Sequence, residues 1–118
     1  MKTWKSIGIV MLVLAVGALG YWSVGSAQEG KSIEQMIAGA KTPADHEAIA
    51  AYYDKEARDA HEKHTKHQKM EEFYQKNPAM NKAGFSFHCD RIALDFQEAA
   101  RNYENLAKLH REMAKPAK

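Results

Sequence analysis

Two long stretches of the chain are free of Gly and Pro, and both carry apolar and aromatic residues at alternating spacings of four and three. They run from Ala44 to Lys76 and from Phe85 to Lys115. This spacing is typical of one face of a helix that packs against another helix. No segment shows the two-residue alternation of a strand. The sequence therefore predicts an all-α fold with long helices at about 43–76 and 83–115.

The predicted inner faces of the two helices differ in the size of their side chains. The first face comprises His46, Ala50, Tyr53, Ala57, Ala60, His64, His67, Glu71 and Tyr74. The second comprises Phe85, Cys89, Ile92, Phe96, Ala99, Tyr103, Leu106, His110 and Met113. Asn77-Pro78 marks a turn between them. We expect an antiparallel two-helix hairpin at 42–118, in which large residues of the second helix pack on alanines of the first.

A short helix is expected before the hairpin, within a linker at 28–41. Ser32 and Gln35 have the spacing of a capping box, and apolar residues follow at 33–38. A two-helix hairpin buries little apolar surface, and domains of this size usually need further support. The sequence therefore favours a homodimer that completes a four-helix bundle.

The first 27 residues have the order of a secretory signal peptide. Lys2 and Lys5 precede an apolar run at 7–22, and Gly25-Ser26-Ala27 follows as a cleavage site. The alternative is a retained membrane anchor, because 7–27 reaches the length of about 20 residues that a bilayer span requires. Cleavage predicts a periplasmic or secreted protein. Retention predicts an inner-membrane anchor that faces the periplasm.

Charge and motif content argue against two classes of function. The chain has 17 basic and 15 acidic residues, and two of the basic ones, Lys2 and Lys5, lie in the leader. The remainder is formally neutral and lacks the positive field that nucleic-acid binding requires. No nucleophile elbow, phosphate loop or H-E-x-x-H motif is present. We therefore expect neither a nucleic-acid partner nor an enzyme.

A set of soft metal ligands falls near the turn end of the hairpin. The folded-back register places His67 opposite Cys89, with His64 one turn away, His88 beside Cys89, and Met70 adding a thioether. Imidazole with thiolate suits zinc or copper, and a thioether favours copper. The sequence predicts a copper or zinc site at these five residues, with Met70 and His88 as auxiliary ligands. Buffering, sensing or delivery of the metal would be its role.

A second histidine pair falls at the open end of the hairpin. The same register places His46 opposite His110, with Met113 one turn further on. Such a pair with a thioether is able to bind copper weakly. Alternatively, each histidine serves only the terminus of its own helix.

Other interpretations of the same residues remain open. The histidines could be ordinary partly buried groups bonded to carbonyls or carboxylates, with Met70 as packing. Cys89, the single cysteine, could form an intermolecular disulfide. The hairpin could also be a non-catalytic accessory or scaffold subunit of an envelope complex, with its leader retained and its leftover aromatics docked on a partner.

Several short stretches resemble a group of small exported bacterial helical-hairpin proteins of unassigned function. They are Thr-Pro-Ala-Asp-His-Glu at 42–47, Tyr-Tyr at 52–53, His-Cys at 88–89 and Leu-Ala-Lys-Leu-His-Arg at 106–111. The resemblance covers residues 42–114. It implies export and a helical hairpin, and it gives no residue a role.

Overall fold

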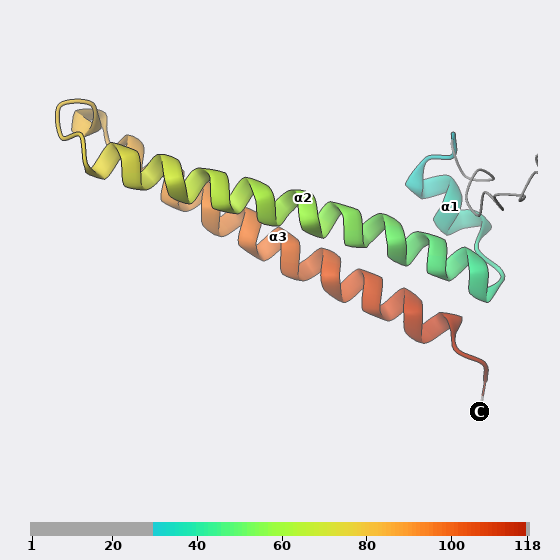
Figure 1. The fold of residues 1–118 in the computed structure, drawn as a ribbon. Helices are drawn as coiled ribbons and strands as arrows, with labels where there is room; N and C mark the ends of the chain where they lie inside the picture. Colours follow the sequence, from blue (N-terminus) through green and yellow to red (C-terminus); the bar gives the residue numbers. More distant parts are fainter. Residues whose placement is uncertain (1–29, 118) are drawn as a thin grey trace, which may run out of the picture.

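The computed structural model describes residues 30–117, which form a helical hairpin with one short helix at its open end. Its elements are α1 (Ile33–Gly39), α2 (Pro43–Gln75), the 3-10 turn η1 (Asn81–Ala83) and α3 (Phe85–Ala114), with no strand in this part of the chain. α2 and α3 run side by side in opposite directions, and α1 lies beside the first half of α2 (Figure 1). The predicted all-α hairpin is confirmed, and the predicted leader lies outside the described residues.

Both helix starts expected from the sequence are present. The Ser32 hydroxyl accepts from the Gln35 backbone N–H, and the Gln35 side chain accepts from the Ser32 N–H. Thr42 and Asp45 form the same reciprocal arrangement at the start of α2, where Pro43 occupies the first turn. These bonds satisfy N–H groups that have no partner within the helix.

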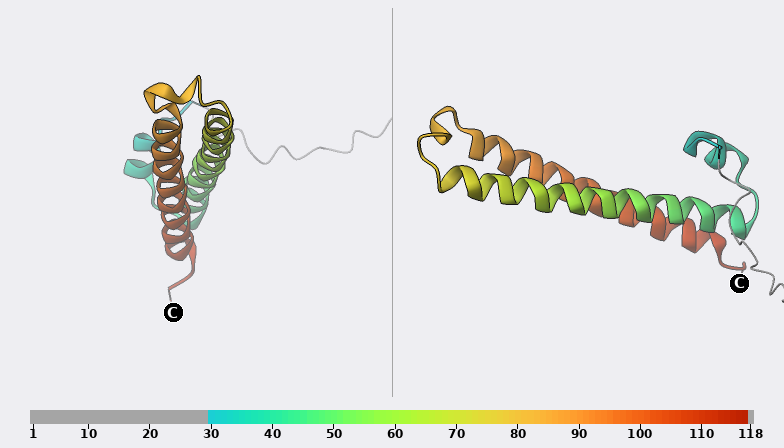
Figure 2. Two further views of the ribbon diagram at one scale, coloured as in Figure 1. Left: turned by 90° about the vertical axis from the view of Figure 1, so that its left-hand side faces the viewer. Right: turned by 45° about the horizontal axis from the view of Figure 1, so that its top comes forward.

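The turn between the long helices is closed by its own side chains. Asn81 accepts from the Ser86 backbone N–H and donates to the Ser86 hydroxyl, each over 2.9 Å. Gly84 precedes α3 with φ of 77°, a left-handed conformation that glycine adopts without steric cost. Figure 2 shows that this turn and α1 lie at opposite ends of the hairpin. The chain reversal that the sequence predicts near Asn77-Pro78 is therefore confirmed.

Small side chains form the interface between α2 and α3. The buried residues are Ile49, Ala50, Ala57 and Ala60 on α2, and Cys89, Ala93, Ala100 and Ala107 on α3. Ile49 is the one large side chain among residues 30–117 that is fully buried. With alanine on both sides, the two helices are able to approach closely. We call this row of small residues the alanine seam.

The predicted inner face is confirmed for α2 but only half correct for α3. Every residue predicted for the α2 face is buried or half-buried. On α3, Ile92 and Leu106 are 38% and 37% exposed, and the adjacent Ala93 and Ala107 take the buried positions instead. The expected packing of large residues on alanines is therefore wrong at Ile92 and Leu106. A close helix pair selects the smallest side chain at each step, and the larger neighbour is moved to the side.

The displaced residues form a second, exposed apolar row on α3. Phe85, Ile92, Leu106 and Met113 recur at multiples of seven, which places them on one side of the helix. They are between 37% and 62% exposed. We call these four residues the apolar flank.

None of the helices in residues 30–117 combines the length and the apolar character needed to cross a membrane.

The alanine seam makes a prediction that separates two adjacent residues. Ala100→Leu should lower the free energy of unfolding by about 1–3 kcal/mol, because a larger side chain cannot fit at a position that is 0% exposed. Ala99→Leu is the matched control, since Ala99 is only half-buried, and it should change stability by less. Urea denaturation followed by circular dichroism measures both. Equal losses in the two variants would contradict the seam.

Candidate functional site

His64 is bonded across the helix interface to the backbone of α3. Its Nδ1 lies 2.8 Å from the carbonyl oxygen of Ala93. A carbonyl only accepts, so Nδ1 carries the proton, and in the neutral ring Nε2 carries the lone pair. Metal-binding histidines commonly donate their second ring N–H to a carbonyl or carboxylate in this way. His64 is therefore held in the tautomer that binds a metal through Nε2.

His67 has a buried ring nitrogen without a hydrogen-bond partner. Its ring stacks on Phe96 of α3, with the centroids 5.8 Å apart and the planes at 22°. Within the described part of the chain, no group bonds to its buried Nδ1. A buried polar atom left in this state costs about 1–3 kcal/mol. His67 is thus the group in the hairpin with most to gain from a ligand or a bound water.

Cys89 is a free thiol in the alanine seam. It is 6% exposed, and it lies one turn before Ala93, the residue that accepts from His64. Burial keeps the thiol from solvent oxidants and from a second chain. The sulfur is therefore a sheltered ligand candidate on the helix opposite the histidines.

The side chains on α2 and α3 lean in opposite directions. Each Cα–Cβ bond tilts toward the N-terminus of its own helix, and the two N-termini lie at opposite ends of the hairpin. Tyr53 consequently stacks on His110, at 5.9 Å between centroids, as well as on Tyr103 at 6.2 Å. By the same lean, His67 reaches Phe96. The register predicted from the sequence pairs residues whose Cα atoms lie at the same height along the hairpin. It does not include the tilt of the side chains along the helix axis.

The five predicted ligands are not assembled around one point. Among residues 30–117, no three His, Cys, Asp or Glu side chains are grouped closely enough to hold a metal ion. His88 is exposed, and its ring contacts Phe87 on its own helix. Coordination of a metal by the five predicted ligands stays a prediction.

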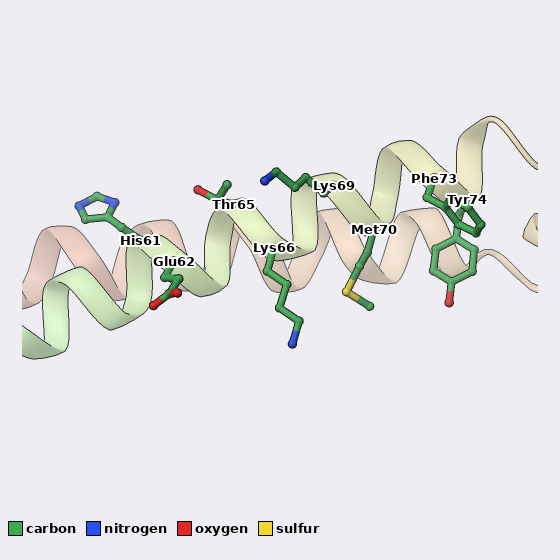
Figure 3. A pocket seen from close by; sticks show the side chains of 8 residues that line it. All are labelled: His61, Glu62, Thr65, Lys66, Lys69, Met70, Phe73 and Tyr74. Carbon is green, nitrogen blue, oxygen red and sulfur yellow. The ribbon is translucent and has the colours of Figure 1, made fainter.

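Met70 is half-buried on α2. Together with Phe73, Tyr74 and Lys66 it borders an open hollow whose lining residues all belong to α2 (Figure 3). In that view, Met70 and Lys66 project to the same side of the helix. Because one helix supplies the whole lining, the hollow is open surface. The place of Met70 in the metal site stays a prediction.

One edge of the hairpin carries ionic contacts that sequence reasoning missed. The Nε2–H of His61 donates to Glu104 over 2.8 Å, and the Arg111 guanidinium bonds to both carboxylate oxygens of Asp54. Glu47 lies 3.8 Å from Arg111. The hydrogen bond from Arg111 holds the pKa of Asp54 below its ordinary value. Spacing within a single helix gives no signal for these pairs, because they join different helices.

The second predicted histidine pair is confirmed. The Nδ1 atoms of His46 and His110 lie 3.1 Å apart, with the ring centroids separated by 5.3 Å. One of these nitrogens donates and the other accepts, so one proton lies between the two Nδ1 atoms. Burial of His110, and then the nearby charge of His46, lower the pKa of His110 below 6.5. The pair therefore favours the neutral form of His110.

This lowered pKa predicts a loss of stability in acid. As the pH falls below 6.5, the unfolded chain takes up a proton at residue 110 before the folded chain does, so the free energy of unfolding decreases. His110→Gln should lose less stability than the wild type between pH 8 and pH 5, as measured by urea denaturation in the presence of a chelator. His88→Gln, which changes an exposed histidine on the same helix, should retain the wild-type slope. A wild-type slope in His110→Gln would contradict the assignment.

No known protein family, curated protein or solved structure matches this chain. The resemblance to small exported bacterial hairpin proteins is therefore still a prediction. Function has to be argued from the geometry of the hairpin itself.

Proposed function

We propose that this is an exported protein that binds copper or zinc through His64, His67 and Cys89. Its role would be to buffer, sense or deliver the metal, with Met70 and His88 as auxiliary ligands. The observation that carries the proposal is the bond from His64 to the Ala93 carbonyl. It fixes the tautomer and orientation that a histidine ligand needs before any metal arrives.

The two other principal ligands support the proposal by their burial. The unpartnered Nδ1 of His67 gains a partner when it coordinates a metal. The thiol of Cys89 is enclosed and ionises when it binds a metal. Ligands from facing helices are the usual way in which bundles hold metals. Thiolate with imidazole favours copper or zinc over hard cations.

A metal titration tests this proposal. Purified, reduced mature protein should take up one equivalent of Cu(I) or Zn(II) at these three ligands. His64→Ala and Cys89→Ser should each weaken binding by at least about 10-fold to 100-fold, the loss that even outer-shell partners of metal ligands produce. Competition with a chromophoric chelator measures the affinity. When Cu(II) or Co(II) replaces these ions, a thiolate-to-metal charge-transfer band in the absorption spectrum would indicate that Cys89 binds the metal.

His61→Ala is the matched control for the titration. His61 lies one turn before His64 on the same helix, but its ring is exposed and bonded to Glu104. This variant should keep the wild-type affinity. Wild-type protein that binds neither metal at micromolar concentration, or a loss in His61→Ala equal to that in His64→Ala, would remove the central site.

We further propose that two copies pair through the apolar flank to form a four-helix bundle. The hairpin buries few large side chains, while its flank leaves Phe85, Ile92, Leu106 and Met113 between 37% and 62% exposed. The hairpin has the length to supply a stable interface: α2 and α3 contain 33 and 30 residues, or about 50 and 45 Å. A second copy supplies a matching apolar row in equal amount.

Light scattering after size exclusion tests the pairing. The wild type should have twice the mass of the chain, and Ile92→Glu with Leu106→Glu should have the mass of one. Leu94→Glu is the control, because Leu94 is similarly exposed, at 44%, but lies outside the flank. A monomeric wild type, or a dimer that the double variant does not disrupt, would exclude this interface.

The exposed flank also favours a second candidate function, that of an accessory subunit in an envelope complex. In that case the flank docks on a different protein, the leader is retained as an anchor, and the histidines have no metal role. N-terminal sequencing of the native protein separates the two candidates. A soluble chain that begins at Gln28 and binds metal argues against the accessory role, and an intact leader without metal binding supports it.

A further inference from the structure

His46 and His110 form a second cluster that the proposed site does not use. They lie at the open end of the hairpin, and the 18 positions from His46 to His64 correspond to about 27 Å of helix. The two rings come from different helices and meet through their Nδ1 atoms at 3.1 Å. The pair is therefore a separate place where α2 and α3 are joined, and its chemistry does not depend on Cys89.

The distance between these two nitrogens is close to the bite of a metal chelate. Zinc–nitrogen bonds measure about 2.0–2.1 Å, so two nitrogens at tetrahedral angles on one zinc ion lie about 3.3 Å apart. The observed separation is 3.1 Å. Binding an ion would change this separation by only a few tenths of an ångström, but each ring would also have to reorient within its own plane so that its Nδ1 lone pair points at the ion.

We propose that His46 and His110 hold a copper or zinc ion between their Nδ1 atoms and so clamp the open end of the hairpin. In the neutral pair, one Nδ1 carries a proton and the other accepts it. On metal binding that proton moves to Nε2 of the same ring, which leaves both Nδ1 lone pairs for the metal. Charge and protons balance, and no further reactant is needed.

The surroundings of the pair support a positioned site. The Tyr53 ring stacks on His110 at 28° between planes and limits its rotation. Arg111, the nearest fixed cation in sequence, is already bonded to Asp54 and lies 3.8 Å from Glu47. Its charge is therefore largely compensated, and repulsion of an incoming cation is reduced. The same ion pair holds α2 and α3 together beside the histidines.

The remaining coordination positions are open. Two protein nitrogens leave room for water or for a third ligand, and Met113 lies one turn beyond His110 with 62% of its surface exposed. A thioether in that position would favour Cu(I) over zinc. Because the pair alone supplies only two protein ligands, we expect weaker binding here than at a three-ligand site.

The test uses a background variant that lacks the proposed central site, His64→Ala with Cys89→Ser. Metal-free protein with these two changes is titrated with Cu(I) and with Zn(II). We expect one equivalent to bind and the melting temperature to rise, since a ligand that binds only the folded state stabilises it. Adding His110→Gln or His46→Gln should abolish both effects. Adding His61→Gln, which removes a different cross-helix bond, should leave both unchanged.

A second measurement does not depend on these additional variants folding. Imidazole nitrogen resonances of His46 and His110 in the unsubstituted chain should shift together on addition of Zn(II), at Nδ1 rather than Nε2. If the background variant binds nothing while the wild type binds one equivalent, the clamp is overturned and the central site stands. If binding persists after His110→Gln and His46→Gln, or the Nδ1 resonances do not move, the clamp is likewise overturned. Absence of binding in the wild type overturns both sites.

Discussion

Close contact between two rows of alanine is the constraint on which the rest of this hairpin depends. Ala50 and Ala57 on α2 meet Ala93, Ala100 and Ala107 on α3, and none of them is more than 4% exposed. Backbones brought together in this way leave no room for a large side chain between them. Rings that belong to the inner faces must therefore lie along the seam. Most of the cross-helix ring pairs are stacked, with angles between planes of 22° to 28°.

The same closeness gives the two edges of the hairpin different chemistry. On one edge, Asp54 and His61 of α2 reach Arg111 and Glu104 of α3. On the other, the larger apolar residues displaced from the seam remain exposed as the apolar flank. Exposed ion pairs contribute little net stability, whereas apolar surface of this extent lowers the free energy only when covered. The flank is therefore the part of the surface where a partner, identical or different, gains most.

The sequence predicted the helices well because their signals are local. Caps at Ser32 and Thr42 and the turn after Asn77 depend on neighbouring residues, and each is present. On α3, Ile92 and Leu106 were predicted to be buried because they are more apolar than alanine. The buried residues are instead the next ones along the chain, Ala93 and Ala107. Hydrophobicity alone predicts that the larger residue is buried, but only the smaller residue fits between two closely packed helices. That choice depends on the partner helix, which a pattern within one helix does not contain.

The candidate sites, like the helices, were predicted well only where the signal does not depend on how side chains from the two helices meet. His46 and His110 were paired correctly, because both lie on inner-face positions that were assigned correctly. His67 was placed opposite Cys89, but the lean of the side chains brings its ring to Phe96. Backbone level fixes which turns face each other, while side-chain length and direction decide which atoms meet. Whether His67 and Cys89 bind one metal ion therefore stays a prediction, while the stack of His67 on Phe96 is a contact that the register did not predict.

Histidine has an unusual share in holding this hairpin together. Among residues 30–117, the hydrogen bonds that join α2 to α3 involve either Arg111 or an imidazole, at His46 with His110, at His61 and at His64. A proton or a metal that occupies these nitrogens acts directly on the contact between the helices. Protonation of His110 and helix pairing are thus coupled through the same atoms, and a metal at the proposed sites would be coupled to helix pairing in the same way.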